Sequence, residues 1–88
     1  MIQRTLLALS DPTRREILKM LKKGEKTAGE IAERFDISAP AISRHLSVLK
    51  DAELIAASRE GKFLIYSLYR EPLLALDDWI NEFLKEDL

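Results

Sequence analysis

The side chains best suited to chemistry in this sequence are hydroxyls and cations that share one side of residues 38–51. Apolar residues recur on the opposite side at helical spacing, and these are Ile42, Leu46 and Leu49. The polar side comprises Ser43, Arg44, Ser47 and Lys50. Guanidinium and hydroxyl groups donate hydrogen bonds to the acceptor atoms that bases present in the DNA major groove. The pattern therefore predicts a helix whose outer face can read DNA.

Residue types used in catalysis and metal binding are scarce. The 88 residues include one His and no Cys, which excludes a disulfide, a thiolate metal site and a thiol redox switch. Without a glycine-rich phosphate loop or room for a substrate cleft, we expect neither an enzyme nor a cofactor site. Asp77, Asp78 and Glu82 could coordinate a hard cation, but no histidine or ordered loop accompanies them to fix the geometry. A solvated acidic face is the favoured interpretation, and we expect no metal site.

The one histidine, His45, directly follows Arg44 and turns toward the inner side of the same helix. The favoured interpretation is a partly packed ring with a hydrogen bond to the backbone or to a DNA phosphate. We therefore include His45 among the candidate DNA-binding residues and disfavour a metal-binding or catalytic role.

Residues 27–52 have the pattern of a helix-turn-helix. Thr27 and Glu30 have the spacing of a capping box at the start of the first helix. Asp36 lies at the turn, where we expect a left-handed backbone, which Asp tolerates better than most residues. Ser38 is predicted to cap the second helix, and Pro40 falls in its first turn, where a missing N–H does no harm.

Two further helices are predicted near the N-terminus, over residues 2–10 and 12–23. We expect Asp11 to cap the second of them and Gly24 to end it. The remaining surface of this second helix is basic and carries Arg14, Arg15, Lys19, Lys22 and Lys23. A solvated face is the favoured interpretation for most of these cations, with phosphate contacts left open for some.

The pattern changes after residue 53. Residues 54–59 and 62–68 are rich in β-forming types and flank Glu60-Gly61, a two-residue loop typical of a hairpin. Arg59 and Lys62 stand on either side of this loop, which matches the wing of a winged helix, and we expect them to contact phosphates or the minor groove. The alternative is a hairpin that only closes the core. Which face of the second strand points inward stays open, because residues 63–66 are all apolar or aromatic.

A last helix is predicted to begin at Glu71-Pro72, and its apolar surface exceeds what one edge of a small domain covers. Its apolar stripe is widened by Leu74, Leu84 and Leu88. Because the first helix has a similar surplus, we expect the two terminal helices to form a homodimer interface. The candidate interface residues are Leu6, Leu7, Leu9, Leu73, Leu76, Trp79, Ile80 and Phe83.

Length and charge fit one small domain over residues 1–88, without a membrane span or a secretory signal, so we expect a cytoplasmic protein. The net charge of −1 conceals two unlike parts. Residues 1–70 hold 13 Lys/Arg and 9 Asp/Glu, a net of +4, whereas residues 71–88 hold 1 against 6, a net of −5. We expect DNA to meet the basic part. The acidic part either meets another partner or only solvates its helix.

Together these motifs resemble the ArsR-type winged-helix repressors, most closely the short SdpR-like autorepressors. The matching stretches, which span nearly the whole chain, are SDPTRR at 10–15, TAGEIAERF at 27–35, ISAPAISRHLSVLKDAELI at 37–55, REGK at 59–62 and YSL at 66–68. The resemblance implies a mainly α fold with a two-stranded β-hairpin. The implied order is four helices, two strands and a final helix.

The resemblance also implies a sequence-specific transcriptional repressor, autoregulatory, that binds a palindromic double-stranded DNA operator as a homodimer. The family's groove-reading positions fall on Ala39, Pro40, Ser43 and Arg44 of this chain. Thr27 and Ser38 would lie near phosphates, and the wing contact falls on Arg59 and Lys62.

Many family members carry Gln-Ser where this chain has Ala39-Pro40, so discrimination is expected to depend more on Ser43 and Arg44. Similarity to autorepressors adds a sequestering membrane protein as a further candidate partner. The alternative function is a winged-helix module for protein–protein contact, with DNA binding reduced or lost.

Overall fold

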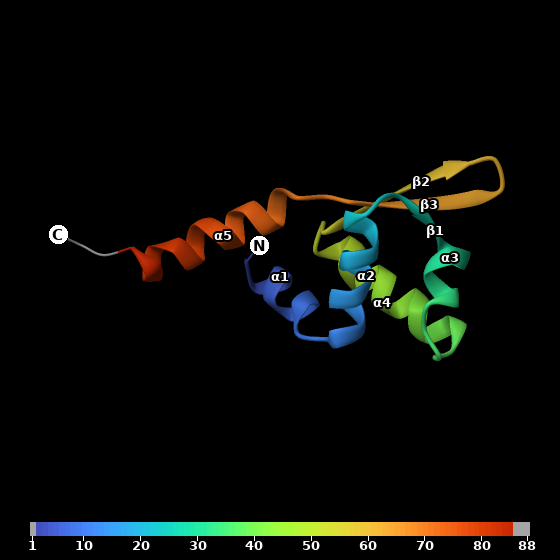
Figure 1. Cartoon of the computed structure of the whole chain (residues 1–88), viewed down its shortest axis with the longest axis horizontal. Helices are drawn as coiled ribbons and strands as arrows, with labels where there is room; N and C mark the ends of the chain where they lie inside the picture. The colour runs from blue at the N-terminus through green and yellow to red at the C-terminus, as the bar shows by residue number, and fades with distance from the viewer. Residues whose placement is uncertain (1, 86–88) are drawn as a thin grey trace.

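Residues 2–85 are described by the computed structural model; Leu88 and acidic residues 86 and 87 lie outside this range. The elements are α1 (Ile2–Leu9), α2 (Pro12–Lys22), β1 (Lys26–Thr27), α3 (Ala28–Glu33), α4 (Ala39–Asp51), β2 (Ile55–Glu60), β3 (Phe63–Leu68) and α5 (Glu71–Leu84). The molecule measures 55 × 25 × 21 Å, because the β2–β3 hairpin and α5 extend in opposite directions from the helical body (Figure 1). The expected fold class, mainly α with a β-hairpin, is confirmed.

The core lies where α2, α3 and α4 meet the start of the hairpin. Its largest fully buried side chains are Ile17, Ile31, Leu49 and Leu54. Burial of a side chain of this size contributes roughly 1.5–3 kcal/mol. The predicted inner stripe of α4 is confirmed, because Ile42, Leu46 and Leu49 are all buried.

The ends of α2 follow from local sequence. The Asp11 carboxylate accepts a hydrogen bond from the backbone N–H of Arg14 at 3.1 Å, which confirms the predicted cap. At the other end Lys23 is the capping residue and Gly24 follows with φ of +151°, a conformation that side chains rarely adopt. Lys23 is therefore the C-cap of α2, and Gly24 lies one residue beyond it, where glycine commonly ends a helix.

The expectation of a left-handed residue at Asp36 was wrong. Among residues 2–85 the one non-glycine residue with positive φ is Glu53, at 59°. The Leu54 N–H donates to the Leu49 carbonyl at 3.0 Å, and the Glu53 N–H donates to the Lys50 carbonyl at 2.9 Å. This is the Schellman motif, in which a left-handed residue closes the helix end, and here it ends α4. The turn at Asp36 closes through bends that need no positive φ.

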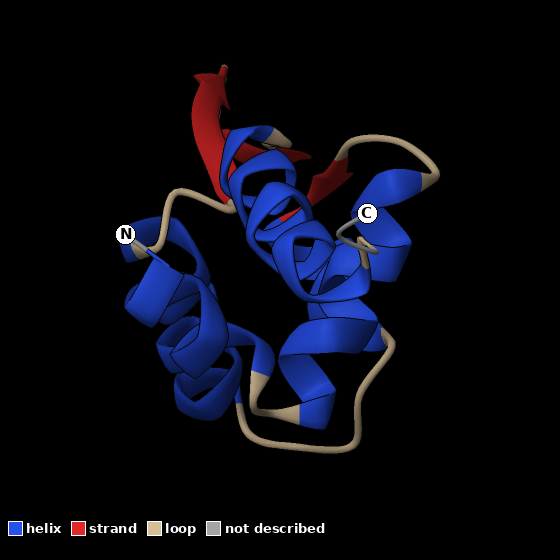
Figure 2. Cartoon of the chain, turned by 90° about the vertical axis from the view of Figure 1, so that its left-hand side faces the viewer, coloured by secondary structure: helices blue, strands red, loops and turns tan. Residues whose placement is uncertain are grey.

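The sheet has three strands in the order β1-β3-β2, all antiparallel. Strand β1 was not predicted, because two residues show no periodicity and their pairing partners lie far along the chain. Lys26 pairs with Tyr66, and Thr27 pairs with Ile65. Figure 2 shows the strands gathered at one edge of the helical body.

The hairpin loop lies one residue later than predicted. Glu60 pairs with Phe63, so the two loop residues are Gly61 and Lys62. Gly61 has φ of 61°, which fits a type II′ turn with glycine at its first central position. In the C-terminal half of β3, Tyr66 and Leu68 pack against the core, so the face that carries them points inward there.

Candidate nucleic-acid interface

Helix α4 presents the polar face that the sequence predicted. The Ser38 hydroxyl accepts the Ala41 N–H at 3.2 Å and begins the helix, with Pro40 in the first turn. The inner stripe anchors α4 on the core, which leaves the candidate readers Ala39, Pro40, Ser43 and Arg44 exposed. An exposed guanidinium on a rigidly held helix has the geometry for a bidentate contact with guanine.

Thr27 joins the sheet to the helix-turn-helix. Its hydroxyl accepts the Glu30 N–H at 3.1 Å, and the Glu30 carboxylate accepts the Thr27 N–H at 2.8 Å. The capping box is therefore confirmed. These hydrogen bonds lower the pKa of Glu30, with the Thr27 backbone N–H as the largest cause and the Thr27 hydroxyl next.

Two cations occupy the tip of the hairpin, which forms the wing. Arg59 lies opposite Leu64 near the end of β2, and Lys62 is in the loop; both are exposed. The Lys62 ammonium lies 5.7 Å from the centre of the Phe63 ring, within the range of a cation–π contact. The structure thus brings two cations together on a stiff two-stranded ribbon.

The structure places His45 differently from the other candidate readers. Its side chain is 18% exposed, and its Nδ1 lies 3.1 Å from the Arg14 guanidinium and 3.8 Å from the Asp11 carboxylate. The ring is partly packed, as expected, but its hydrogen-bond partner is a side chain rather than backbone.

Arg14 is the residue whose role the sequence did not reveal. The sequence favours a solvated surface for most cations of α2, yet the Arg14 guanidinium donates to the carbonyls of Ala8 at 2.7 Å and Leu7 at 2.9 Å. A local signal existed: a residue three positions after the cap Asp11 lies in the first turn of α2, beside the end of the preceding helix.

The electrostatics of this junction favour an ionised Asp11. Partial burial would raise the pKa of its carboxyl, but the backbone hydrogen bond from Arg14 and attraction to the His45 ring, when that ring carries a charge, act in the other direction. The net result is a lowered pKa.

A basic groove of about 530 Å³ lies along the C-terminal half of α2. Its lining residues are Glu16, Lys19, Met20, Lys22, Lys23, Lys26 and Arg34. Lys19 forms an ion pair with Glu16 at 3.2 Å, but both side chains are largely exposed, so this pair adds little stability.

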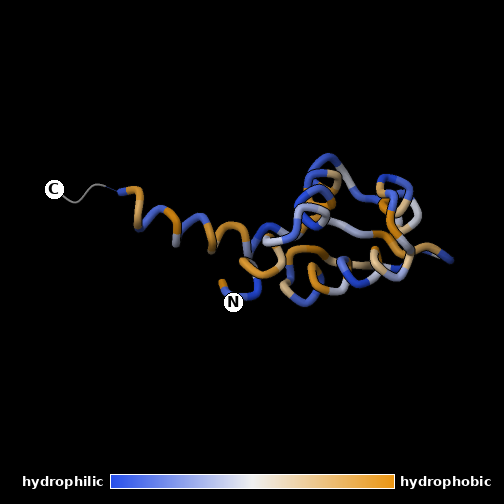
Figure 3. The backbone as a smooth tube through the Cα atoms, turned by 90° about the horizontal axis from the view of Figure 1, so that it is seen from below, coloured by the Kyte–Doolittle hydropathy of each residue, from blue (hydrophilic) through white to orange (hydrophobic). Residues whose placement is uncertain are grey.

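Helix α5 extends from the body as an arm, and Figure 3 shows apolar segments recurring along it. Phe83 is 70% exposed and Trp79 is 38% exposed, and their rings meet edge to face at 5.0 Å. Ile80 on the arm and Leu6 and Leu7 on α1 are also exposed. Of the other candidate interface residues, Leu76 is buried within the protomer, and Leu9 and Leu73 pack against the core.

The acidic side of α5 carries Asp77, Asp78 and Glu82, all exposed. Asn81 donates to the Asp77 carboxylate at 3.3 Å. Within the described residues, no group of three or more histidine, cysteine or acidic side chains is arranged to hold a metal ion.

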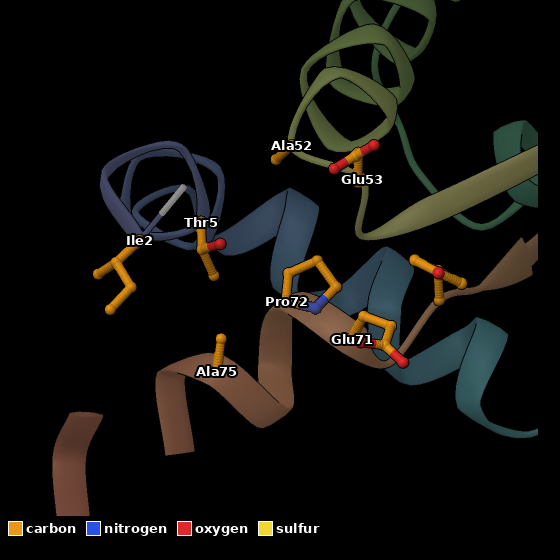
Figure 4. A pocket seen from close by; sticks show the side chains of 8 residues that line it. Ile2, Thr5, Ala52, Glu53, Glu71, Pro72 and Ala75 are labelled. Carbon is orange, nitrogen blue, oxygen red and sulfur yellow. The ribbon is translucent and has the colours of Figure 1, made fainter. Parts of the chain in front are cut away.

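A cavity of about 330 Å³ lies where α1, the end of α4 and the start of α5 approach one another. Figure 4 shows Thr5 of α1 and Ala75 of α5 on its two sides, with Pro72 at the start of α5. The left-handed residue Glu53 lies at its edge. At this point α5 begins beside the helical body.

Comparisons with known proteins agree with this geometry. A model of the family described as bacterial regulatory protein, arsR family, matches residues 11–57. The chain is 51% identical over 79 residues to the transcriptional repressor SdpR of Bacillus subtilis (strain 168), covering 90% of this chain and 88% of that protein. It is 40% identical over 77 residues to an arsenical resistance operon repressor of Staphylococcus xylosus, covering 88% and 70%.

The fold is also similar to solved structures. A crystal structure of an ArsR family transcriptional regulator superposes with a TM-score of 0.88 at 32% identity, covering 93% of this chain and 84% of that one. Within residues 2–85, no helix combines the length and apolar character needed to cross a membrane.

Proposed function

Because the chain belongs to the ArsR family of bacterial regulatory proteins, we propose that it is a transcriptional repressor that binds a palindromic operator as a homodimer. The observation that carries this proposal is the exposed polar face of α4 beside a wing with two cations at its tip. An α-helix fits the major groove, and cations on an adjacent ribbon fit the phosphates beside it.

Within this proposal, Arg44 and Ser43 read bases. Ala39 and Pro40 are exposed but offer no side-chain hydrogen bond. Thr27, Ser38, Arg59 and Lys62 contact phosphates and set the register of the protein on DNA. His45 is left out of direct contact because its Nδ1 already faces Arg14.

The homodimer is built by α1 and α5 of two protomers. The support for this is the exposed apolar surface of the arm, which one protomer leaves uncovered. Burying a side chain such as Phe83 contributes roughly 1.5–3 kcal/mol. Two-fold symmetry would then present two α4 helices to half-sites about 34–36 Å apart.

The test of DNA reading compares two variants on specific and random DNA. The chain is first assayed by mobility shift on DNA upstream of its own gene, which also tests autoregulation. Arg44→Ala should lose about 1–3 kcal/mol of discrimination between operator and random DNA. Lys62→Ala should weaken both complexes alike and flatten the dependence of affinity on salt. Equal loss on both DNAs for Arg44→Ala would contradict the assignment of α4 as the reader.

The test of the dimer uses Phe83→Asp, since a residue 70% exposed in the protomer can be changed without disturbing the core. Glu82→Gln, a neighbour on the acidic side, is the matched control. Sedimentation equilibrium should show a monomer for Phe83→Asp and a dimer for the control. A dimer that survives both changes would place the interface elsewhere.

A second candidate function is a winged helix that binds protein rather than DNA. It is favoured by Ala39 and Pro40, two exposed apolar residues where a reader would carry polar groups. Failure to shift any promoter DNA in moderate salt, with the dimer intact, would support this alternative.

Control of the repressor through a partner is part of the same proposal. The protein acts in the cytoplasm as one domain, and a sequestering membrane protein would dock on the acidic side of α5. Reversing the charges of Asp77, Asp78 and Glu82 should then abolish capture by that partner while leaving operator binding unchanged. Unchanged capture would exclude this surface.

A further inference from the structure

Three helices meet at the Arg14 guanidinium. Its Nε donates to the Ala8 carbonyl at 2.7 Å, one Nη donates to the Leu7 carbonyl at 2.9 Å, and the other Nη lies 3.1 Å from Nδ1 of His45. Arg14 belongs to α2, the two carbonyls end α1, and His45 belongs to α4. One side chain thus connects the helix proposed for dimerisation to the helix proposed for DNA reading.

The end of α1 is held firmly around this point. The last carbonyls of a helix have no partner within it. Here the Ser10 hydroxyl donates to the Leu7 carbonyl at 2.6 Å, and the Arg15 guanidinium donates to the Leu9 carbonyl at 2.6 Å. Because a guanidinium is planar and rigid, the two bonds to α1 fix the direction of the third nitrogen toward His45.

This contact requires one protonation state of His45. Arginine is always a donor, so Nδ1 of His45 must accept, and the ring must be neutral with its proton on Nε2. A protonated ring would bring two cations together at 3.1 Å, and its Nδ1–H would instead be drawn to the Asp11 carboxylate 3.8 Å away.

The charged groups that face the ring come from α2 and its cap, namely Arg14 and Asp11. Helix α1 contributes backbone carbonyls here, already bonded to Arg14 and Arg15. On α4 itself, Arg44 is the neighbour of His45 in sequence and lies on the exposed side. Protonation therefore changes the partner of His45 rather than removing all partners.

We propose that Arg14 and His45 are positioning residues for DNA reading, and that the neutral His45 ring fixes α4 against the end of α1 so that Arg44 meets its base. This inference rests on the proposed operator binding. Exchange of Arg14 for Asp11 as the partner of His45 would shift α4 against α1, and discrimination by Arg44 would fall. We expect the ratio of operator to random-DNA affinity to fall by roughly fivefold, at the low end of couplings between sites.

The test measures that ratio at pH 8 and pH 6 at constant ionic strength, on an operator selected from random DNA at pH 8. Wild type should show the fivefold fall. His45→Asn places an amide oxygen near the position of Nδ1 and does not titrate, so its ratio should stay high at both values. His45→Leu offers no acceptor, so its ratio should be low at both. A wild-type ratio that is equal at the two pH values would overturn the proposal.

A direct measurement on wild type avoids reliance on the folding of variants. His45 is the one histidine of the chain, so its ring nitrogens give unambiguous signals in ¹H–¹⁵N NMR. At pH 8 the ring should carry its proton on Nε2, and protonation should parallel the fall in the affinity ratio. A proton on Nδ1 at pH 8 would overturn the proposal. Failure to select any operator would refute the proposed function itself, whereas a pH-independent ratio on a selected operator refutes this inference alone.

Discussion

Replacing Glu53 with glycine should stabilise the fold. Glu53 closes α4 with φ of 59°, and its side chain is exposed, so little packing is lost with it. A left-handed backbone costs a non-glycine residue about 1–2 kcal/mol. Glycine gains freedom in the unfolded chain, which offsets about 0.4–1 kcal/mol of that relief. Taken at the middle of both ranges, the difference is a net gain of about 0.8 kcal/mol.

The assay is thermal unfolding followed by circular dichroism, at equal protein concentration for all variants. For a domain of this size, 1 kcal/mol changes Tm by about 4–8 °C, so Glu53→Gly should raise it by about 3–6 °C. Glu53→Ala is the matched control, because it removes the carboxylate and keeps the left-handed strain. Its Tm should not rise.

Two results would refute this reasoning. An equal rise for Glu53→Gly and Glu53→Ala would mean that the carboxylate, rather than the backbone, is unfavourable at this position. A fall for Glu53→Gly would mean that the end of α4 does not use the left-handed conformation in solution.

Three further changes test other parts of the fold. Thr27→Ala removes the capping hydroxyl of α3 and should lower the free energy of unfolding by about 1 kcal/mol in urea titrations, while Thr27→Ser should be near wild type. Leu49→Ala opens a cavity in the fully buried core and should cost about 2–5 kcal/mol in the same assay. The folded-state pKa of Asp11 lies below its unfolded value near 3.9. The carboxylate therefore contributes fully to the free energy of unfolding above about pH 4, and this contribution is lost as the pH falls through the lowered pKa. Asp11→Asn should therefore make stability less dependent on pH between about pH 5 and pH 2, measured by acid unfolding; an unchanged slope would count against a stabilising role of the carboxylate.

Local signals in the sequence were reliable where one side chain satisfies a nearby backbone group. The caps at Asp11, Thr27 and Ser38 each accept an N–H three residues later, and each was predicted from residue type and spacing. The stripe of α4 was equally clear, because its period reports which side is buried.

Features that depend on distant partners were not predictable in the same way. Strand β1 exists because Lys26 and Thr27 find partners in β3, about forty residues later in the chain. The left-handed residue fell at Glu53 instead of Asp36, since helix-end geometry, rather than residue preference, decides which position must turn. The role of Arg14 depends on three helices meeting, and its residue type alone gives no sign of that.

The pairing of Thr27 with Ile65 has a consequence for the DNA sites that this protein can accept. Thr27 is at once the end of β1 and the cap of α3, so backbone hydrogen bonds join the wing to the helix-turn-helix in one rigid piece. We therefore expect the base of the wing to keep a constant distance from the helix-turn-helix. A single base pair inserted between the bases proposed for α4 and the position proposed for the wing would displace one contact by about 3.4 Å along the helix axis. Each half-site should therefore tolerate base changes at the wing position far better than changes in its length.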